Sequence, residues 1–283
     1  MKQIIDALSM TSHVHNWLAS STSPQILHVF DSACNLINER REILSVVTQA
    51  VGAGPFNLVI ERDIRFAEYL NLATPVSAAV EQLSLGDLIV HFSGAELWDC
   101  HPDWKILHAE RDTILRQARQ LSEAVPRVSR LCGAPQWGQF AGFLSSSIAT
   151  ADIASCVDAA QKLAGLGQGL TPSGDDFMMG AMFAARIIHR REVAEFIAGE
   201  IGKAAEPLTT SLSAAWLRAA AKGEAGILWH TLFDALISGE ASAIGFHTSN
   251  ILSIGATSGA DALAGFINTC IAYTEIEDQH VVP

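Results

Sequence analysis

The stretch that begins at Gly165 restricts the possible local structure more than any other part of this sequence. From Gly165 to Asp176 it contains four glycines, a proline, a serine and two aspartates, and a run of small and apolar residues follows. The preceding residues 151–164 are amphipathic, so Gly165 is placed to end a helix. Ser173 can cap a second helix, with Asp176 as the acidic residue of a capping box. The sequence therefore predicts a glycine-rich loop that joins two helices.

This loop has the composition of a binding site for a charged ligand. Gly167 and Gly169 allow a ligand to approach the bare backbone. N–H groups at the start of a helix attract anions, whereas the adjacent carboxylates of Asp175 and Asp176 attract a cation such as Mg²⁺. Together these features predict a phosphate-like group bridged by a metal ion. A well-capped helix connection that binds nothing would have the same local sequence.

A second segment repeats the pattern. Residues 173–180 have the form Ser-Gly-x-Asp-x-x-x-Gly, and so do residues 258–265. Ser258 would cap, Asp261 would lie in the first turn, and the glycine one turn later would leave room for another backbone. Two such segments predict a pair of helix starts that face a common site.

Composition limits the class of protein. The chain has 283 residues, of which 49% are hydrophobic and 17% charged, so a folded protein with a large core is expected. Its net charge of −12 argues against nucleic acid as a partner. The apolar runs, such as Phe177–Ala185, are too short to cross a membrane. We expect the apolar excess to be used in buried helices and in subunit contacts, which include a possible homo-oligomer.

The five cysteines are scattered and contain no Cys-x-x-Cys pair. This pattern gives no zinc-site spacing and is typical of a protein in a reducing cytoplasm. The first residues lack the basic start and apolar core of a signal peptide. The expected location is therefore the cytoplasm.

Residues 1–104 are predicted to form a β-rich domain, with a barrel-like or sandwich-like sheet. A short helix is expected at Lys2–Leu8, followed by a connector rich in serine and threonine. Apolar runs bounded by turn residues then predict short strands. These strands are expected at residues 26–38 (two strands or one bent strand), 43–47, 56–60, 76–80 and 87–92.

Residues 105–283 are predicted to form a helical domain, which makes the chain an α+β protein. Residues 126–142 form a stretch that is broken by glycine and proline. Arg186 and Arg190 are expected on a solvated face, and Thr210 is one of four hydroxyl residues that open a helix, where surplus hydroxyls could line a polar pocket. The expected helices cover residues 105–124, 151–164, 177–191, 193–206, 208–222, 225–238, 241–254 and 260–273.

Four segments resemble a known bacterial family. The run Gly-Leu-Gly-Gln-Gly-Leu-Thr-Pro-Ser-Gly-Asp-Asp-Phe at residues 165–177 is similar to the signature of the family that includes AllH, a subunit associated with oxamate carbamoyltransferase in anaerobic allantoin catabolism. Residues 28–36, 54–56 and 255–261 also resemble recurring segments of that family. The resemblance extends along most of the chain.

The resemblance implies a subunit that works beside two partners, AllF (also called FdrA) and AllG. Together they would convert oxalurate and phosphate into oxamate and carbamoyl phosphate. Combined with the loop chemistry, this predicts Asp175, Asp176 and Asp261 as catalytic residues, and the first two as metal ligands. The residues expected to bind the small anionic substrate are Gly167, Gly169, Thr171, Ser173, Gly174, Thr210, Ser258 and Gly259.

Two other functions fit the same residues. The chain could be a non-catalytic scaffold or assembly subunit, in which the glycine motif only packs helices. It could also be a metal-dependent hydrolase that uses the paired aspartates with water. Stabilisation of the chain by metal or phosphate would favour a binding site over a scaffold.

Overall fold

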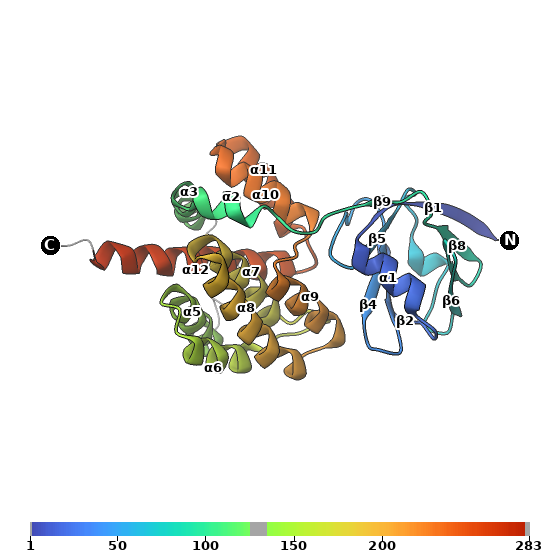
Figure 1. Ribbon diagram of the computed structural model, residues 1–283, viewed down its shortest axis with the longest axis horizontal. Helices are drawn as coiled ribbons and strands as arrows, with labels where there is room; N and C mark the ends of the chain where they lie inside the picture. Colours follow the sequence, from blue (N-terminus) through green and yellow to red (C-terminus); the bar gives the residue numbers. More distant parts are fainter. Residues whose placement is uncertain (1, 125–134, 281–283) are drawn as a thin grey trace. The chain divides into compact units, whose positions relative to one another are not determined.

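The computed structural model describes residues 2–124 and 135–280, and the chain divides into two compact units (Figure 1). The first unit contains Met1–Cys100 and the short segment Ala225–Ile227. The second unit contains His101–Glu224 and Leu228–Pro283. The first is built on a β-sheet and the second on helices, which confirms the α+β prediction.

The sheet of the first unit is nearly closed and barrel-like. Its hydrogen-bonded order is β2-β3-β4-β5-β1-β8-β7-β6, and β9 pairs with β1 outside this path. Most neighbours are antiparallel, but β4 is parallel to β5 and β1 is parallel to β8 and β9. The strands are β1 (Gln3–Met10), β2 (Gln25–Val29), β3 (Ala33–Ile37), β4 (Ile43–Val47), β5 (Asn57–Ile60), β6 (Val76–Ala79), β7 (Gln82–Leu85), β8 (Leu88–His91) and β9 (Glu96–Leu97).

The predicted helix at Lys2–Leu8 is wrong, because this segment forms β1. Ile5 and Ala7 are buried while Ile4 and Leu8 are exposed, which is the alternation of a strand with one face on the core. The strand pairs with β8 on one side and with β5 on the other. The apolar spacing also fits a helix, so the pairing partners decided the structure.

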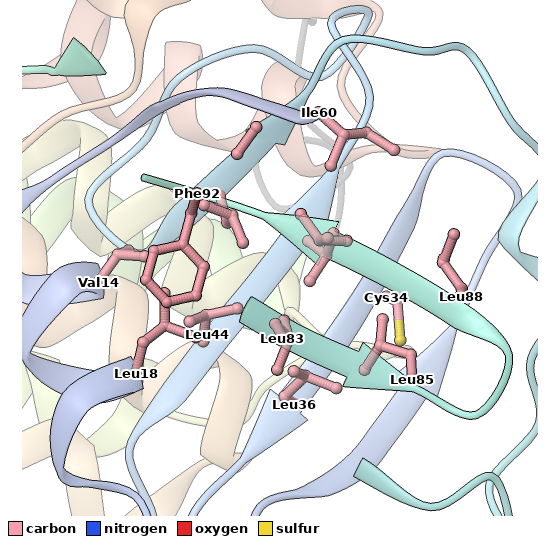
Figure 2. Close-up of a cluster of buried hydrophobic side chains, with 14 of the residues drawn as sticks. Val14, Leu18, Cys34, Leu36, Leu44, Ile60, Leu83, Leu85, Leu88 and Phe92 are labelled. Atoms are coloured by element: carbon pink, nitrogen blue, oxygen red, sulfur yellow. The ribbon is translucent and has the colours of Figure 1, made fainter. Parts of the chain in front are cut away.

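A helix also replaces the predicted Ser/Thr-rich connector. α1 (Ser12–Ser20) begins after Thr11, whose hydroxyl accepts a hydrogen bond from the Val14 N–H at 3.2 Å. This is an ordinary N-cap, and it directs Val14, Trp17 and Leu18 into the core. Figure 2 shows Val14 and Leu18 beside Leu44 of β4 and Phe92, which follows β8, in the same core.

The second unit is helical. A short 3₁₀ turn, η1 (Phe66–Glu68), belongs to the first unit, and η2 (Glu206–Leu208) lies in the second. The α-helices of the second unit are α2 (Trp104–Ala109), α3 (Arg111–Ala124), α5 (Pro135–Ala149), α6 (Ile153–Leu163), α7 (Ser173–Ile188), α8 (Arg191–Ala205), α9 (Ser211–Lys222), α10 (Ile227–Ser238), α11 (Ala241–Leu252) and α12 (Ser258–His280). The predicted break at residues 126–142 is wrong from Pro135 onward, where α5 begins, and its earlier part lies outside the described residues.

α7 is the central helix of this unit and packs against α12, α8, α9 and α5 (Figure 1). Its residues are buried on nearly all sides, as expected for a helix that is apolar all round. Aromatic side chains meet at one of its faces, where Phe183 stacks on Trp104 and contacts Trp229 edge-on. The fold thus surrounds α7 with other helices, and its first turn carries the Ser-Gly-x-Asp motif.

The expected solvated face for Arg186 is wrong, although Arg190 is exposed. Arg186 is only 6% exposed, and its Nη2 donates to the Ala221 carbonyl oxygen at 2.6 Å. Its guanidinium carbon lies 5.7 Å from the centre of the Trp104 ring. Burial lowers the pKa of this guanidinium. Helix packing around α7 therefore overrides the local polarity of the residue.

None of the helices in residues 2–124 and 135–280 is long and apolar enough to span a membrane.

Candidate functional site

The loop between α6 and α7 depends on glycines in the left-handed region. Gly165 has φ of 71° directly after the C-cap of α6, which confirms its predicted role as a helix stop. Gly167 and Gly169 have φ of 125° and 96°. A side chain at these positions would strain the backbone. The loop therefore needs glycine at all three positions to reach the start of α7.

The first motif docks on the end of the preceding helix by a close backbone contact. A Cβ atom on Gly174 would lie 2.0 Å from the carbonyl oxygen of Leu163. The Gly174 N–H donates to the Leu166 carbonyl oxygen at 2.9 Å, and the Leu166 N–H donates to Leu163 at 3.0 Å. Gly174 is therefore required for packing, and its N–H is already used within the chain.

The second motif makes the same kind of contact through a shorter connection. A Cβ atom on Gly259 would lie 1.7 Å from the carbonyl oxygen of Ile251, which is near the end of α11. The Gly259 N–H donates to Ile254 at 3.1 Å, and the Ile254 N–H donates to Ile251 at 3.0 Å. The sequence repeat is thus also a structural repeat of a helix end, a turn and a helix start.

The glycines that end the two motifs pack α7 and α12 against each other reciprocally. A Cβ atom on Gly180 would lie 1.7 Å from the carbonyl oxygen of Ala262, and one on Gly265 would lie 1.9 Å from that of Phe177. Gly180 thus faces Ala262, which is three residues before Gly265, and Gly265 faces Phe177, which is three residues before Gly180. The two helices therefore contact each other through backbone, with a local two-fold relation.

The two helix starts lie side by side, as the repeated pattern predicts. The hydroxyl oxygens of Thr171 and Ser258 are 2.8 Å apart and form a hydrogen bond. Both residues are half-buried. Asp176 and Asp261 are more deeply buried, with 5% and 0% exposure. The site is thus a hydroxyl pair next to a pair of buried acidic residues.

Asp175 is held within the chain by three hydrogen bonds. Its Oδ1 accepts from the Gly165 N–H at 3.0 Å, and its Oδ2 accepts from the hydroxyls of Thr209 and, at 2.8 Å, Ser213. Burial raises the pKa of this carboxyl, and the three hydrogen bonds oppose that rise. Asp175 therefore ties the loop and α9 to α7.

Asp176 has a different environment. Its Oδ2 is buried and has no hydrogen-bond partner among the described residues. Burial raises its pKa to about 8, and repulsion from Asp261 and Asp175 acts in the same direction, while the hydroxyls of Ser258 and Thr171 oppose the rise. Because an unpaired buried carboxylate is unfavourable, this residue requires a proton or a positive ligand.

The predicted capping by Ser173 is wrong, because Ser173 is the first residue inside α7 and Pro172 occupies the N-cap without a side-chain bond. The N–H groups of Asp175 and Asp176 donate to the Pro172 carbonyl oxygen, at 2.9 and 3.2 Å. Ser173 is buried beside Gly167, where a Cβ atom would lie 2.6 Å from the Ser173 nitrogen. The helix start is thus stabilised mainly by its own loop.

Two partners of the site come from the hydroxyl-rich segment, of which only Thr210 was predicted to bind the substrate, although the surplus hydroxyls were expected to line a polar pocket. Thr210 is the N-cap of α9, with its hydroxyl accepting from the Ser213 N–H and donating to the Leu170 carbonyl oxygen at 2.6 Å. Thr209 and Ser213 are the residues that bind the Asp175 carboxylate. The sequence feature that indicates these contacts is the run of hydroxyl residues at 209–213.

A second group of potential metal ligands consists of three consecutive residues, Asp99, Cys100 and His101, whose ligand atoms lie within 4.8 Å of one another. Each of them has other interactions. Their proximity follows from their adjacency in the chain, so this group has less weight than residues brought together by folding.

The fold and the site define an α+β protein whose helical unit joins two equivalent helix starts, with hydroxyl and acidic side chains between them. The chain belongs to the AllH family. The family model described as oxamate carbamoyltransferase subunit AllH matches the sequence over residues 163–270, which contain both motifs. The family model of the AllH family N-terminal domain matches residues 6–97. Neither the comparison with curated proteins nor the comparison with solved structures produced a match.

Proposed function

We propose that this chain is a subunit of a carbamoyltransferase that converts oxalurate and phosphate into oxamate and carbamoyl phosphate. The family description names such a subunit, which implies partner subunits. The observation that supports a chemical role is the pairing of two helix starts at Thr171 and Ser258, next to buried Asp176 and Asp261. This kind of site is suited to bind a small anion together with the positive charge that balances it.

The proposed reaction moves one carbamoyl group. An oxygen of hydrogen phosphate attacks the carbamoyl carbon of oxalurate, and the bond from that carbon to the amide nitrogen breaks. The proton of the phosphate is transferred to this nitrogen, which leaves as the amide nitrogen of oxamate. Charge develops on the carbamoyl oxygen during the attack, and hydrogen-bond donors that are fixed in position stabilise such charge.

Within the site, the hydroxyls of Thr171, Ser173 and Ser258 are the proposed donors to the substrate. Gly167 and Gly169 would provide open backbone at the loop. The N–H groups of Gly174 and Gly259 already bind carbonyl oxygens of their own loops, so these two residues would contribute space rather than donors. Thr210 would act through the position of Leu170, to which it is bonded.

The proposed cofactor is Mg²⁺ or a similar cation, which would neutralise the acidic residues and polarise a substrate oxygen. The buried oxygen of Asp176 that has no hydrogen-bond partner among the described residues fits such a group. The proposed partners are FdrA/AllF-like and AllG-like subunits, in the anaerobic breakdown of allantoin in the cytoplasm.

The test is an assay of carbamoyl phosphate formation from oxalurate and phosphate by the reconstituted complex. Asp176→Asn keeps the shape of the side chain but removes its charge. We expect activity to fall by roughly 100-fold or more, the range seen when one charge-stabilising group is removed. Asp158→Asn is the matched control, because Asp158 is an exposed residue of α6 that pairs with Lys162, and it should retain full activity.

The scaffold alternative is also supported by an observation, since the glycines of both motifs pack backbone against backbone. A scaffold would need these glycines but not the acidic side chain between them. Full activity of a normally folded Asp176→Asn complex would therefore favour the scaffold and reject the proposed site.

A further inference from the structure

The helical unit contains a buried carboxyl group, that of Asp176, on which no positive charge acts in the described chain. Asp176 is 5% exposed, and its Oδ2 has no hydrogen-bond partner among residues 2–124 and 135–280. The nearby charges that act on it are those of Asp261 and Asp175, which are also acidic. A buried carboxylate among other carboxylates is strongly unfavourable unless it takes up a proton or something positive lies against it.

Asp175 is not available to bind a cation. Both of its oxygens accept hydrogen bonds, from the Gly165 N–H and from the hydroxyls of Thr209 and Ser213. A cation there would have to displace these donors. Its place in the structure is that of a positioning residue, which holds the loop next to α7.

The polar side chains that act on the Asp176 carboxyl all carry oxygen. Asp261 is fully buried in the first turn of α12, and the hydroxyls of Ser258 and Thr171 bond to each other at 2.8 Å next to Asp176. Carboxylate and hydroxyl oxygens are hard ligands, which favour Mg²⁺, Mn²⁺ or Ca²⁺ over softer metals.

We propose that one divalent cation of the Mg²⁺ or Mn²⁺ class binds between Asp176 of α7 and Asp261 of α12, with the hydroxyls of Thr171 and Ser258 as further oxygen ligands. The cation thus lies between the two repeated motifs, which are related by the local two-fold symmetry, and it joins α7 to α12. The adjacent pair Asp175–Asp176 does not bind it. This inference refines the cation of the proposed function, and it can be measured on the full chain without substrate.

The experiment is a titration of the metal-free full-length chain with Mn²⁺, followed by the loss of the free-ion electron paramagnetic resonance signal. The wild type should bind about one ion, with a dissociation constant below about 1 mM, the weak end of protein oxygen sites. Mg²⁺ should compete, and it should raise the melting temperature of the wild type. Absence of Mn²⁺ binding up to that concentration would overturn the proposal.

The variants distinguish the two acidic pairs. Asp176→Asn and Asp261→Asn should each weaken Mn²⁺ binding by roughly 100-fold, because each removes a charged ligand, whereas Ser258→Ala should weaken it by about tenfold. Asp158→Asn, the exposed control, should bind like the wild type. A loss for Asp175→Asn that equals or exceeds the loss for Asp176→Asn would contradict the assignment.

Circular dichroism of each variant in EDTA separates loss of a ligand from loss of the fold. Ser258→Ala leaves the buried acidic residues in place, so it tests the site even if Asp261→Asn does not fold. Unchanged Mn²⁺ affinity in folded Ser258→Ala and Asp176→Asn would reject the proposal. Mn²⁺ binding without carbamoyl phosphate formation would reject the proposed function and leave this inference intact.

Discussion

At the scale of single residues, two adjacent aspartates with similar burial have opposite surroundings. Asp175 is 1% exposed and Asp176 is 5% exposed. The first accepts three hydrogen bonds, whereas an oxygen of the second accepts none in the described chain. Hydrogen bonding, and not burial, therefore separates a carboxylate that holds the structure from one with an oxygen left unpaired in the described chain.

The role of Asp175 predicts a large loss of stability when it is truncated. Asp175→Ala leaves the half-buried Gly165 N–H and Thr209 hydroxyl and the buried Ser213 hydroxyl without their acceptor. Each unsatisfied buried group costs about 1–3 kcal/mol, so we expect the free energy of unfolding to fall by about 3 kcal/mol or more.

Chemical denaturation in EDTA measures this effect without any contribution from bound metal. Asp158→Ala should change the free energy of unfolding by less than about 1 kcal/mol, because Asp158 forms an exposed salt bridge. If Asp175→Ala were as mild as this control, Asp175 would not be the residue that ties the loop to α7.

At the scale of elements, the site depends on how closely α7 and α12 approach. At the two points of contact, Gly180 and Gly265 have no side chain, so the backbone of one helix meets the backbone of the other. This brings the first turns together, so that Thr171 reaches Ser258 and Asp176 comes close to Asp261. The packing of the helices and the geometry of the site therefore depend on the same glycines.

Gly180→Ala should consequently disturb both packing and site. Its Cβ would lie 1.7 Å from the Ala262 carbonyl oxygen, which belongs to the backbone and cannot rotate away. We expect a destabilisation of about 3 kcal/mol or more, at the upper end of overpacking effects. Thermal or chemical unfolding of the full chain measures it.

Gly245→Ala is the matched control for this change. Gly245 lies inside α11, is exposed, and has no atom within 4 Å of the position of a new Cβ. Alanine is favoured over glycine in a helix, so this variant should be more stable than the wild type by about 0.5–1 kcal/mol. A similar gain for Gly180→Ala would show that α7 and α12 can separate at no cost.

At the scale of the whole molecule, the first unit is discontinuous in sequence. The segment Ala225–Ile227, which follows α9 and includes the first residue of α10, belongs to the β unit. The Ala225 N–H donates to the Cys100 carbonyl oxygen at 2.8 Å, and the Ile227 N–H donates to that of Ala53 at 2.9 Å. Ala225 is fully buried. The stability of the β unit therefore depends partly on a segment distant in sequence.

Ala225→Pro tests this dependence, since proline has no N–H to donate to Cys100. We expect faster hydrogen exchange in the amides of β4, β5 and the loop between them, with a smaller change in the β7–β8 hairpin. Mass spectrometry of the intact chain measures both. Ala225→Ser retains the N–H and should exchange nearly as the wild type does. Equal protection in the proline variant would mean that the segment contributes nothing to the β unit.

Much of this structure was determined by local sequence. Turn residues and apolar runs predicted most strands, and β4 has the bounds that the pattern indicates. Gly165 ends α6 as expected, because only glycine adopts a left-handed conformation there at low cost. The repeated Ser-Gly-x-Asp pattern identified both helix starts. These features depend on steric and hydrogen-bonding preferences within a few residues.

The tertiary structure alone decided the remaining features, because they depend on contacts between residues far apart in the chain. Lys2–Leu8 has apolar spacing that fits a helix or a strand, and pairing with β5 and β8 made it a strand. Arg186 is buried because α9 and Trp104 pack over it. The different roles of Asp175 and Asp176 likewise arise from Thr209 and Ser213 on one side and from α12 on the other, and no local pattern encodes which carboxylate these distant groups will satisfy.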